Sequence, residues 1–207
     1  MDTATAHAWV RALAAAVRDN VDLLTQLDSA IGDADHGTNL QRGFTAVLTA
    51  LEGREFATPG EVLVKTGTTL ISTVGGASGP LYGSAFRAAG KQLTEPVATA
   101  GQLRLALTAG LEAVQKLGAA TLGDKTMIDA YGPALDAFGD ALDQGENLKR
   151  AAGKAADAAE VGMRATIPMI ARKGRASYLG ARSEGHQDPG ATSTALVFRA
   201  LAEVVPA

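Results

Sequence analysis

The sequence is divided into eight segments whose apolar residues recur every three or four positions, separated by short polar loops rich in glycine and proline. In the first segment, for example, Val10, Leu13 and Val17 would lie on one face of a helix. The segments span residues 4–27, 38–52, 59–74, 80–93, 99–117, 127–144, 147–171 and 189–204. This pattern predicts an all-α protein, an up-and-down bundle of eight antiparallel helices.

The segment 59–74 also fits a strand, because it alternates apolar and polar residues and is rich in valine and threonine. We prefer a helix, since Leu63 and Leu70 belong to a helical stripe and nothing nearby offers a partner strand. Two prolines fall inside predicted helices. Pro133 lies near a helix start, where proline is tolerated, whereas Pro168 should bend or end the seventh helix.

The loops between these segments are of two kinds. Those after the second, fourth and sixth segments (EGREFATPG, LTEPVATAG, DQGEN) are ordinary polar turns. Those after the first, third, fifth and seventh (GDADHG, GGASGP, GAATLGDKT, KGRASYLGARSEGHQD) are rich in glycine, hydroxyl groups and charge. Because alternate loops of an up-and-down bundle lie at the same end, the four unusual loops should form one active site in a single domain, residues 1–207.

Composition excludes several classes of protein. Of the 207 residues 46% are hydrophobic, which is enough for a folded core and argues against disorder. The net charge of −3 gives no basic surface for nucleic acid. The absence of cysteine excludes disulfides, thiolate metal sites and a cysteine nucleophile. Neither a signal peptide nor a membrane span is expected, and the cytoplasm is the expected location.

Three aspartates, Asp28, Asp33 and Asp35, stand within eight residues of the stretch DSAIGDADHGTNL. Carboxylates without cysteine suit Mg²⁺ or Ca²⁺ better than zinc. An EF-hand does not fit, because Phe44 stands where its twelfth-position glutamate should be. One aspartate alone could simply cap a helix or turn. Three of them beside His36 indicate a metal site.

The second unusual loop, GGASGPLYG, combines glycines with the start of a helix. Ser78 could cap that helix and Pro80 would fit its first turn. A glycine-rich segment before a helix N-terminus is a natural phosphate site. The loop lacks the G-K-[ST] of a Walker A loop and the spacing of a Rossmann fingerprint, so by itself it could equally be a tight turn.

The remaining two loops add cations and another helix start. LGDKTM offers Asp124, Lys125 and Thr126, of which the aspartate or threonine could cap the next helix. The last loop holds three cations that could neutralise phosphate or simply be solvated, Lys173, Arg175 and Arg182. Asp188 and Pro189 suit the N-cap and first position of the last helix.

Carboxylates, amide-rich helix N-termini and arginines at one end of a bundle are the groups that phosphoryl transfer uses. A magnesium ion takes few protein carboxylates and completes its shell with phosphate oxygens and water. The sequence therefore predicts a helical protein that binds a magnesium nucleotide or another phosphate ester.

The motifs LDSAIGDADHGTNL, GGASGPLYGSAF, GDKTMIDA and KGRASYLGARSEGHQDPGATS resemble, in this order and over essentially the whole chain, the nucleotide-binding L subunit of dihydroxyacetone kinase. They are similar also to the C-terminal domain of single-chain, ATP-dependent dihydroxyacetone kinases. The resemblance implies a closed barrel of eight antiparallel helices with the nucleotide at one end. It also implies that Asp28, Asp33 and Asp35 hold two Mg²⁺ ions that bridge the phosphates of ADP or ATP.

The same resemblance implies twelve nucleotide-binding residues: His36, Gly37, Thr38, Asn39, Ala77, Ser78, Gly118, Met127, Arg175, Asp188, Pro189 and Gly190. Of these, Ala77 and Ser78 would face phosphate, Gly118 and Met127 would border the base, and Arg175 would stabilise charge. The family usually reads G-D-G-D-H-G, whereas this chain has Ala34 between two aspartates. If that position needs a positive φ angle, alanine costs about 1 kcal/mol there.

The resemblance further implies partners. In this family dihydroxyacetone is held covalently by a histidine of a separate K subunit or N-terminal domain, for which this chain has no room. A free-standing L subunit usually keeps ADP as a cofactor, which accepts a phosphoryl group from a phosphohistidine of the M subunit of a phosphotransferase system. Homo-oligomerisation stays open.

Two alternatives stay open as well. One is an ATP-dependent subunit acting on dihydroxyacetone or another short ketose or polyol. The other, of a different class, is a nucleotide-sensing protein without chemistry that docks on a K subunit or a transcriptional regulator. The fatty-acid kinase type is less suitable, because its kinase module carries further domains on the same chain.

Overall fold

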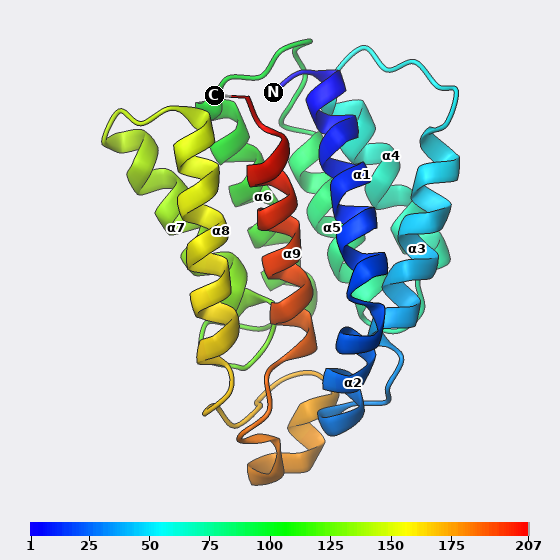
Figure 1. Ribbon diagram of the computed structural model, residues 1–207, viewed down its shortest axis with the longest axis vertical. Coiled ribbons are helices and arrows are strands. Elements are labelled where there is room, and N and C mark those ends of the chain that lie inside the picture. The colour runs from blue at the N-terminus through cyan, green and yellow to red at the C-terminus, as the bar shows by residue number, and fades with distance from the viewer. Residues whose placement is uncertain (207) are drawn as a thin grey trace.

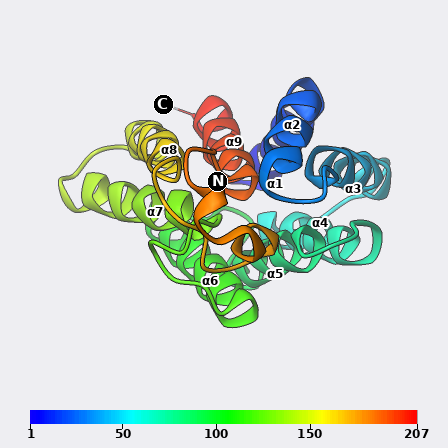
Figure 2. The same cartoon turned by 90° about the horizontal axis from the view of Figure 1, so that it is seen from below.

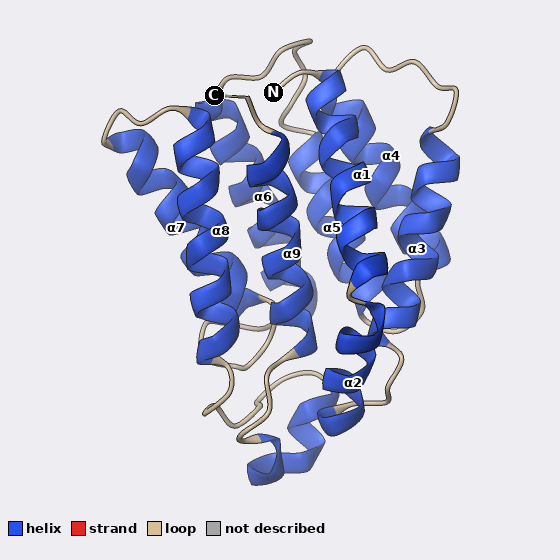
Figure 3. Ribbon diagram, viewed as in Figure 1, coloured by secondary structure: helices blue, strands red, loops and turns tan. Residues whose placement is uncertain are grey.

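A computed structural model describes residues 1–206, and within that range the regular elements are all helical (Figure 3). They are α1 (Thr3–Asp19), α2 (Val21–Ile31), α3 (His36–Leu51), α4 (Pro59–Thr73), α5 (Ser78–Gly90), α6 (Ala100–Gly118), α7 (Ile128–Asp143), α8 (Leu148–Ala165), the 3-10 helix η1 (Arg175–Ser183) and α9 (Pro189–Val204). The all-α prediction is confirmed, and so is the choice of a helix over a strand for residues 59–74, which form α4.

Several details differ from the prediction. The first predicted helix is two helices, because the chain leaves helical geometry at Asn20, whose side-chain amide donates to the carbonyl oxygen of Ala16 at 2.8 Å. The helix predicted to reach residue 171 ends at Ala165, three residues before Pro168. Pro133 lies inside α7, past its first turn. Sequence reasoning also missed η1, which lies in a stretch predicted as loop.

The long helices form a ring (Figures 1 and 2). Going round it, α1 packs against α3, then α4, α5, α6, α7, α8 and α9 follow, and α9 returns to α1. Neighbouring helices run in opposite directions, and α2 extends the line of α1 beyond the ring at the lower end in Figure 1. The indole N–H of Trp9 on α1 crosses the closing contact and donates to the carbonyl oxygen of Val197 on α9 at 2.9 Å. This is the up-and-down arrangement that the periodicity predicted.

Small side chains allow close packing between α4 and α5. A Cβ atom at Gly67 would collide with the backbone oxygen of Gly83, and one at Gly83 would collide with the side chain of Ile71. Bulky aromatic side chains fill the interior instead, with Trp9 and Phe86 in tilted contact at 5.6 Å between ring centroids. None of the described helices combines the length and the apolar character that crossing a membrane requires.

The four unusual loops lie together at the lower end in Figure 1, as the alternation of helices predicted. They comprise residues 32–35, 74–77, 119–127 and 166–188. We call the last segment, 166–188, the cap. Seen from below, η1 within the cap lies across the opening of the ring (Figure 2).

Candidate functional site

A cavity of about 260 Å³ opens among these four loops, and residues from every one of them line it. The lining residues that offer charged, hydroxyl, imidazole or backbone polar groups are Asp28, Asp33, Asp35, His36, Gly76, Ala77, Ser78, Lys125, Thr126, Lys173, Gly174, Arg175, Asp188, Pro189 and Gly190. The lining residues that offer mainly apolar surface are Ile31, Leu81, Tyr82, Val114, Gly118, Ala120, Met127, Ile128 and Ala176. A concave site lined by both polar and apolar residues suits a ligand of mixed character.

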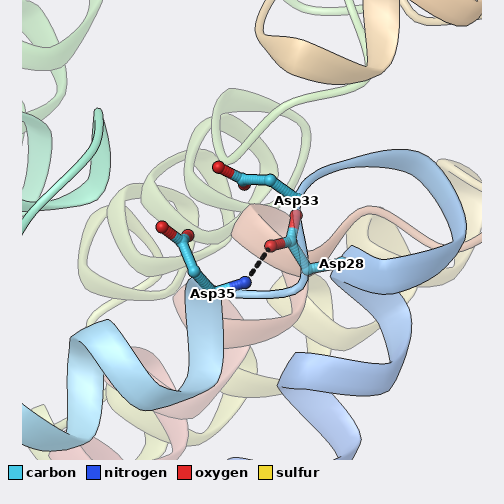
Figure 4. A group of neighbouring side chains, drawn as sticks. All are labelled: Asp28, Asp33 and Asp35. Carbon is cyan, nitrogen blue, oxygen red and sulfur yellow. Dashed lines mark hydrogen bonds between the residues drawn. The ribbon is translucent and has the colours of Figure 1, made fainter.

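Three carboxylates meet at one edge of this cavity (Figure 4). Asp28 is on the last turn of α2, Asp33 is in the loop, and Asp35 is the N-cap residue of α3. One oxygen atom from each lies within 4.8 Å of the others. Three negatively charged groups this close repel one another unless cations or hydrogen-bond donors offset their charge.

Asp28 also has a structural role. Its Oδ2 atom accepts a hydrogen bond from the backbone N–H of Asp35 at 2.8 Å (Figure 4). The same atom accepts from the backbone N–H of His36 at 3.1 Å. These are orphan donors at the start of α3, so Asp28 caps that helix from the preceding one. This helix-capping role accounts for one carboxylate oxygen of Asp28. It does not explain why three aspartates lie together.

The turn between the aspartates requires an unusual backbone. Ala34 has a φ of 60°, in the left-handed region that favours glycine. This confirms that alanine stands at a position of positive φ, and its side chain is exposed. At Gly32 an added Cβ would collide with the Oδ1 atom of Asp28, so the turn also needs a residue without a side chain there.

Arg175 connects the cap to the aspartate cluster. Its Nη2 atom lies 2.9 Å from Oδ2 of Asp33, and its side chain remains 65% exposed. This exposure means the pair itself adds little stability. The geometry nevertheless places a guanidinium group at the mouth of the cavity, where it could meet an anion.

His36 joins three helices beneath the cluster. Its side chain is buried, with Nδ1 3.0 Å from Oγ of Ser78 and Nε2 2.8 Å from Oγ of Ser193. Burial lowers the pKa of this imidazole, although the charges of Asp28 and Asp35 oppose the shift. Since Ser78 bonds to His36 and makes no cap of α5, the prediction that Ser78 caps that helix is wrong. Both ring nitrogens are engaged, so His36 positions the helices.

Two helix N-termini border the cavity. One is that of α5, entered through Gly76 with a φ of 65°. The other is that of α9, where Asp188 is the N-cap residue, Pro189 follows it, and Oδ2 of Asp188 accepts from the N–H of Ala191 at 2.7 Å. The predicted cap and first position of α9 are thus confirmed. Helix N-termini of this kind bind anions such as phosphate.

The carboxyl group of Asp188 is buried. Burial raises its pKa to about 7, and the hydrogen bond from Ala191 opposes that shift. The charge of Asp129 raises the pKa further, and that of Lys125 lowers it. In the structure this carboxyl group therefore changes its charge near neutral pH.

The aspartate cluster has the donor set of a hard divalent cation. Its ligands are carboxylate oxygens open to a cavity that also offers anion-binding amides, and neither sulfur nor a free imidazole accompanies them. These residues fit Mg²⁺, whose remaining ligands would come from phosphate and water. One such ion would offset the mutual repulsion of Asp28, Asp33 and Asp35.

Comparison with known proteins identifies the family. A family model described as the DAK2 domain matches residues 30–203. The chain is 41% identical over 197 residues, 95% of both chains, to the PTS-dependent dihydroxyacetone kinase, ADP-binding subunit DhaL, of Lactococcus lactis. The chain belongs to the DhaL family of DAK2-domain proteins. The corresponding Escherichia coli subunit is 44% identical over 87% of both chains.

The solved structures agree with this DhaL fold. The native crystal structure of the dihydroxyacetone kinase of C. freundii matches 98% of the chain with a TM-score of 0.74 and 29% sequence identity. The same kinase in complex with AMP-PNP and Mg²⁺ matches with a TM-score of 0.72 and 30% identity. The chain spans about a third of that protein's length.

Most of the residues that were predicted to bind nucleotide do line the cavity of this DhaL-family chain, but three do not. Gly37 packs against α2, where a Cβ atom would collide with the carbonyl oxygen of Val21. Thr38 is exposed, and its hydroxyl donates to the backbone oxygen of Asp35 at 3.0 Å. Asn39 is buried and accepts from Arg42 at 2.8 Å. Their roles in binding nucleotide stay predictions.

Sequence reasoning missed part of the site. The apolar lining residues Leu81, Val114 and Ile128 stand at helical positions that a pattern search assigns to the core. Lys125 was noted only as a loop residue, yet it is 1% exposed and has a φ of 62°. Nothing in the local sequence signals that this lysine is buried, because its partners lie more than forty residues away.

Proposed function

We propose that this chain is the nucleotide-binding subunit of a dihydroxyacetone kinase, with magnesium ADP as its cofactor. One observation carries the proposal: a cluster of three aspartates and the starts of two helices line a single cavity. The names of its relatives support it, since the DhaL proteins it matches nearly end to end are ADP-binding subunits.

Different residues of the cavity would bind different parts of the nucleotide. The amides of Ala77 and Ser78 and of Gly190 would receive the phosphates at two helix starts, and Arg175 would offset their charge. The apolar lining residues, which include Met127, would pack against the flat face of a base.

The three aspartates would hold Mg²⁺, for which we propose two ions. Held there, the metal would supply positive charge that offsets the charge on the transferred phosphoryl group. Asp28 contributes a preorganised oxygen, because its hydrogen bonds to the start of α3 fix the carboxylate. Asp33 and Asp35 extend from the turn on either side of Ala34.

The bound ADP would accept a phosphoryl group from a phosphohistidine of an M subunit and pass it to dihydroxyacetone on a K subunit. Support comes from the relatives described as PTS-dependent or PEP-dependent. The chain contains no cysteine nucleophile, and His36, the one histidine among the residues that line the cavity, has both ring nitrogens engaged, so the nucleotide itself is the natural phosphoryl carrier.

A second candidate uses ATP directly as donor. The match to a kinase crystallised with AMP-PNP and Mg²⁺ favours it, and so does 39% identity to human triokinase/FMN cyclase over 88% of the chain. Identity to the ADP-binding subunits is higher, at 41–44% for three of them, and this favours the phosphoprotein donor.

The deciding experiment combines this chain with a K subunit, Mg²⁺ and dihydroxyacetone and compares two donors. Turnover with a phosphorylated M subunit and none with ATP is the expected result. Steady turnover with ATP alone would replace the proposal by the second candidate. In the same assay Asp33→Asn should abolish transfer, whereas Asp22→Asn, which removes an exposed carboxylate from the start of α2, should not.

Nucleotide released on denaturing the purified protein gives an independent measure. About one ADP per chain supports a cofactor that stays bound. Transfer at the wild-type rate by Asp33→Asn would refute the metal assignment. Binding of nucleotide without transfer in any reconstituted mixture would favour a nucleotide-sensing protein without chemistry.

A further inference from the structure

Lys125 lies at the base of the cap, where its ammonium group is surrounded by backbone. Its Nζ atom donates to the carbonyl oxygens of Thr166 at 2.8 Å, Met169 at 3.0 Å and His186 at 2.6 Å. An ammonium group has three N–H bonds, and each of them has an acceptor here. Lys125 therefore has no donor left for a phosphate oxygen, although the residue borders the cavity.

The three carbonyl groups belong to both ends of the cap. Thr166 and Met169 precede η1, and His186 follows it. The two ends are also joined to each other, because the N–H of Gly185 donates to the carbonyl oxygen of Ile167 at 2.8 Å. Lys125 thus fastens both ends of the cap to the loop 119–127.

That loop is a firm anchor. The carboxylate of Asp129 accepts from the N–H of Gly123 at 2.6 Å and of Thr126 at 2.7 Å, which closes the loop against the start of α7. A backbone hydrogen bond of 3.1 Å from Arg172 to the carbonyl oxygen of Asp124 joins the loop to the cap a second time. Lys125 connects a braced loop to the segment that carries Arg175.

The energetic cost of this arrangement shows that it is not an ordinary surface lysine. Removing an ammonium group from water is expensive unless it is fully hydrogen-bonded. The backbone of Lys125 is also in the left-handed region. Burial lowers the pKa of Lys125, and the charges of Asp188 and Glu184 oppose that shift. A neutral amine has only two N–H donors, so three carbonyl acceptors select the ammonium form.

We propose that Lys125 is a positioning residue for the nucleotide site, which holds the cap closed over the bound nucleotide and slows its release. It acts through Arg175, placed at the cavity mouth by the cap, and through the Asp188–Gly190 turn that directly follows the cap's second end. This inference rests on the proposed function, because it concerns the nucleotide that the cavity is proposed to bind.

The first test replaces the ammonium by an apolar group of similar length, in Lys125→Met. The probe is ADP carrying a fluorescent N-methylanthraniloyl group, displaced by excess ADP in the presence of Mg²⁺. The dissociation rate constant should rise about tenfold or more, since the cap opens more often. Binding of Mn²⁺ without nucleotide should not weaken, because Lys125 makes no hydrogen bond to the three aspartates and opening of the cap would only withdraw Arg175, a competing cation, from Asp33.

Lys149→Met is the matched control. The Nζ atom of Lys149 also donates to backbone carbonyls, those of Ala202 at 2.7 Å and Glu203 at 3.3 Å, but at the C-terminus of α9 on the opposite end of the ring. Both variants lose an ammonium group bound to backbone oxygens. Only Lys125→Met should accelerate release. A general loss of stability would instead reduce the number of binding sites in both variants.

Chemical rescue separates the charge from the shape of the side chain. Because the chain has no cysteine, Lys125→Cys provides a single thiol. Alkylation of the denatured protein with 2-bromoethylamine, followed by refolding, rebuilds an ammonium group at nearly the length of lysine. The wild-type release rate should return to within about threefold, whereas a neutral S-methyl adduct should release the probe as fast as Lys125→Met.

Hydrogen exchange on the wild-type protein tests the proposal without any variant. The amides of Arg172 and Gly185, bonded to Asp124 and Ile167, should exchange as one cooperative unit. Independent exchange of the two amides would overturn the proposal, and so would a folded Lys125→Met with the wild-type release rate. If the wild-type chain binds no probe at all, the proposed function fails and this inference with it. Binding with unchanged release counts against Lys125 alone.

Discussion

Replacing Ala34 by glycine should stabilise the protein, although the substitution removes a methyl group. The reason is the φ of 60° at this residue, which an L-amino acid adopts at a cost of about 1–2 kcal/mol and glycine adopts freely. The side chain of Ala34 is exposed, so its removal creates no cavity. The substitution therefore isolates the backbone strain between Asp33 and Asp35.

The expected magnitude follows from two opposing effects. Relief of the left-handed strain gains about 1–2 kcal/mol, and the greater freedom of glycine in the unfolded chain takes back about 0.4–1 kcal/mol. The middles of these two ranges differ by about 0.8 kcal/mol, so the free energy of unfolding should rise by about that amount. For a chain of this length that corresponds to an increase in melting temperature of about 1–4 °C.

Denaturant unfolding of the protein without metal or nucleotide measures the effect. Ala158→Gly, in the middle of α8, is the control with the opposite sign, and it should lose about 0.5–1 kcal/mol because glycine disfavours a helix interior. If Ala34→Gly lowers the free energy of unfolding as Ala158→Gly does, the strain at residue 34 does not exist as described.

Three further predictions concern the ring and the site. Trp9→Phe removes the buried hydrogen bond to Val197 across the closing contact and should cost about 1–3 kcal/mol in chemical denaturation, with the m-value unchanged. Asp28→Asn keeps an oxygen that can cap α3, so the melting temperature of this variant in EDTA should match that of the wild type. Added Mg²⁺ should stabilise the wild type but not the variant, and an equal Mg²⁺ effect on both proteins would contradict the metal site. Burial raises the pKa of Asp188 from 3.8 to about 7, so its contribution to stability is fully present below pH 3.8 and is lost as the pH rises through 7. Without metal and nucleotide, Asp188→Asn should flatten that decline between pH 5 and 8, and parallel curves of unfolding free energy against pH would refute the shift.

The sequence predicted the architecture because each long helix carries its own periodic apolar stripe, and strict alternation of helices then decides which loops share an end. It failed where local preference and tertiary contacts disagree. The break at Asn20 lies inside a continuous stripe, since Val17 and Val21 keep helical spacing across it. The 3-10 helix η1 has few buried side chains, so no periodic pattern could indicate it.

In the candidate site, the residues that could be predicted from the sequence are those whose residue type alone indicates a ligand. A cluster of aspartates predicts a metal site, and glycines before a helix predict an anion site. The residues missed depend on tertiary position: Lys125 and the apolar lining residues reach the cavity only when distant segments of the chain pack together. His36 was predicted to bind nucleotide, but its buried hydrogen bonds to Ser78 and Ser193 show that it also joins helices.

The ring topology brings carbonyl groups, which repel anions, close to an anion site, and the structure shows how some of them are engaged. An up-and-down ring brings as many helix C-termini as N-termini to each end, so amides that attract phosphate at the starts of α3, α5, α7 and α9 lie beside carbonyl groups that repel it. Next to the cavity, Lys125 covers carbonyl groups at and just beyond the end of α8. At the end of α2, the N–H of Gly32 occupies the carbonyl oxygen of Asp28. With these carbonyls engaged, the free amides and the cations can determine the charge preference of the cavity.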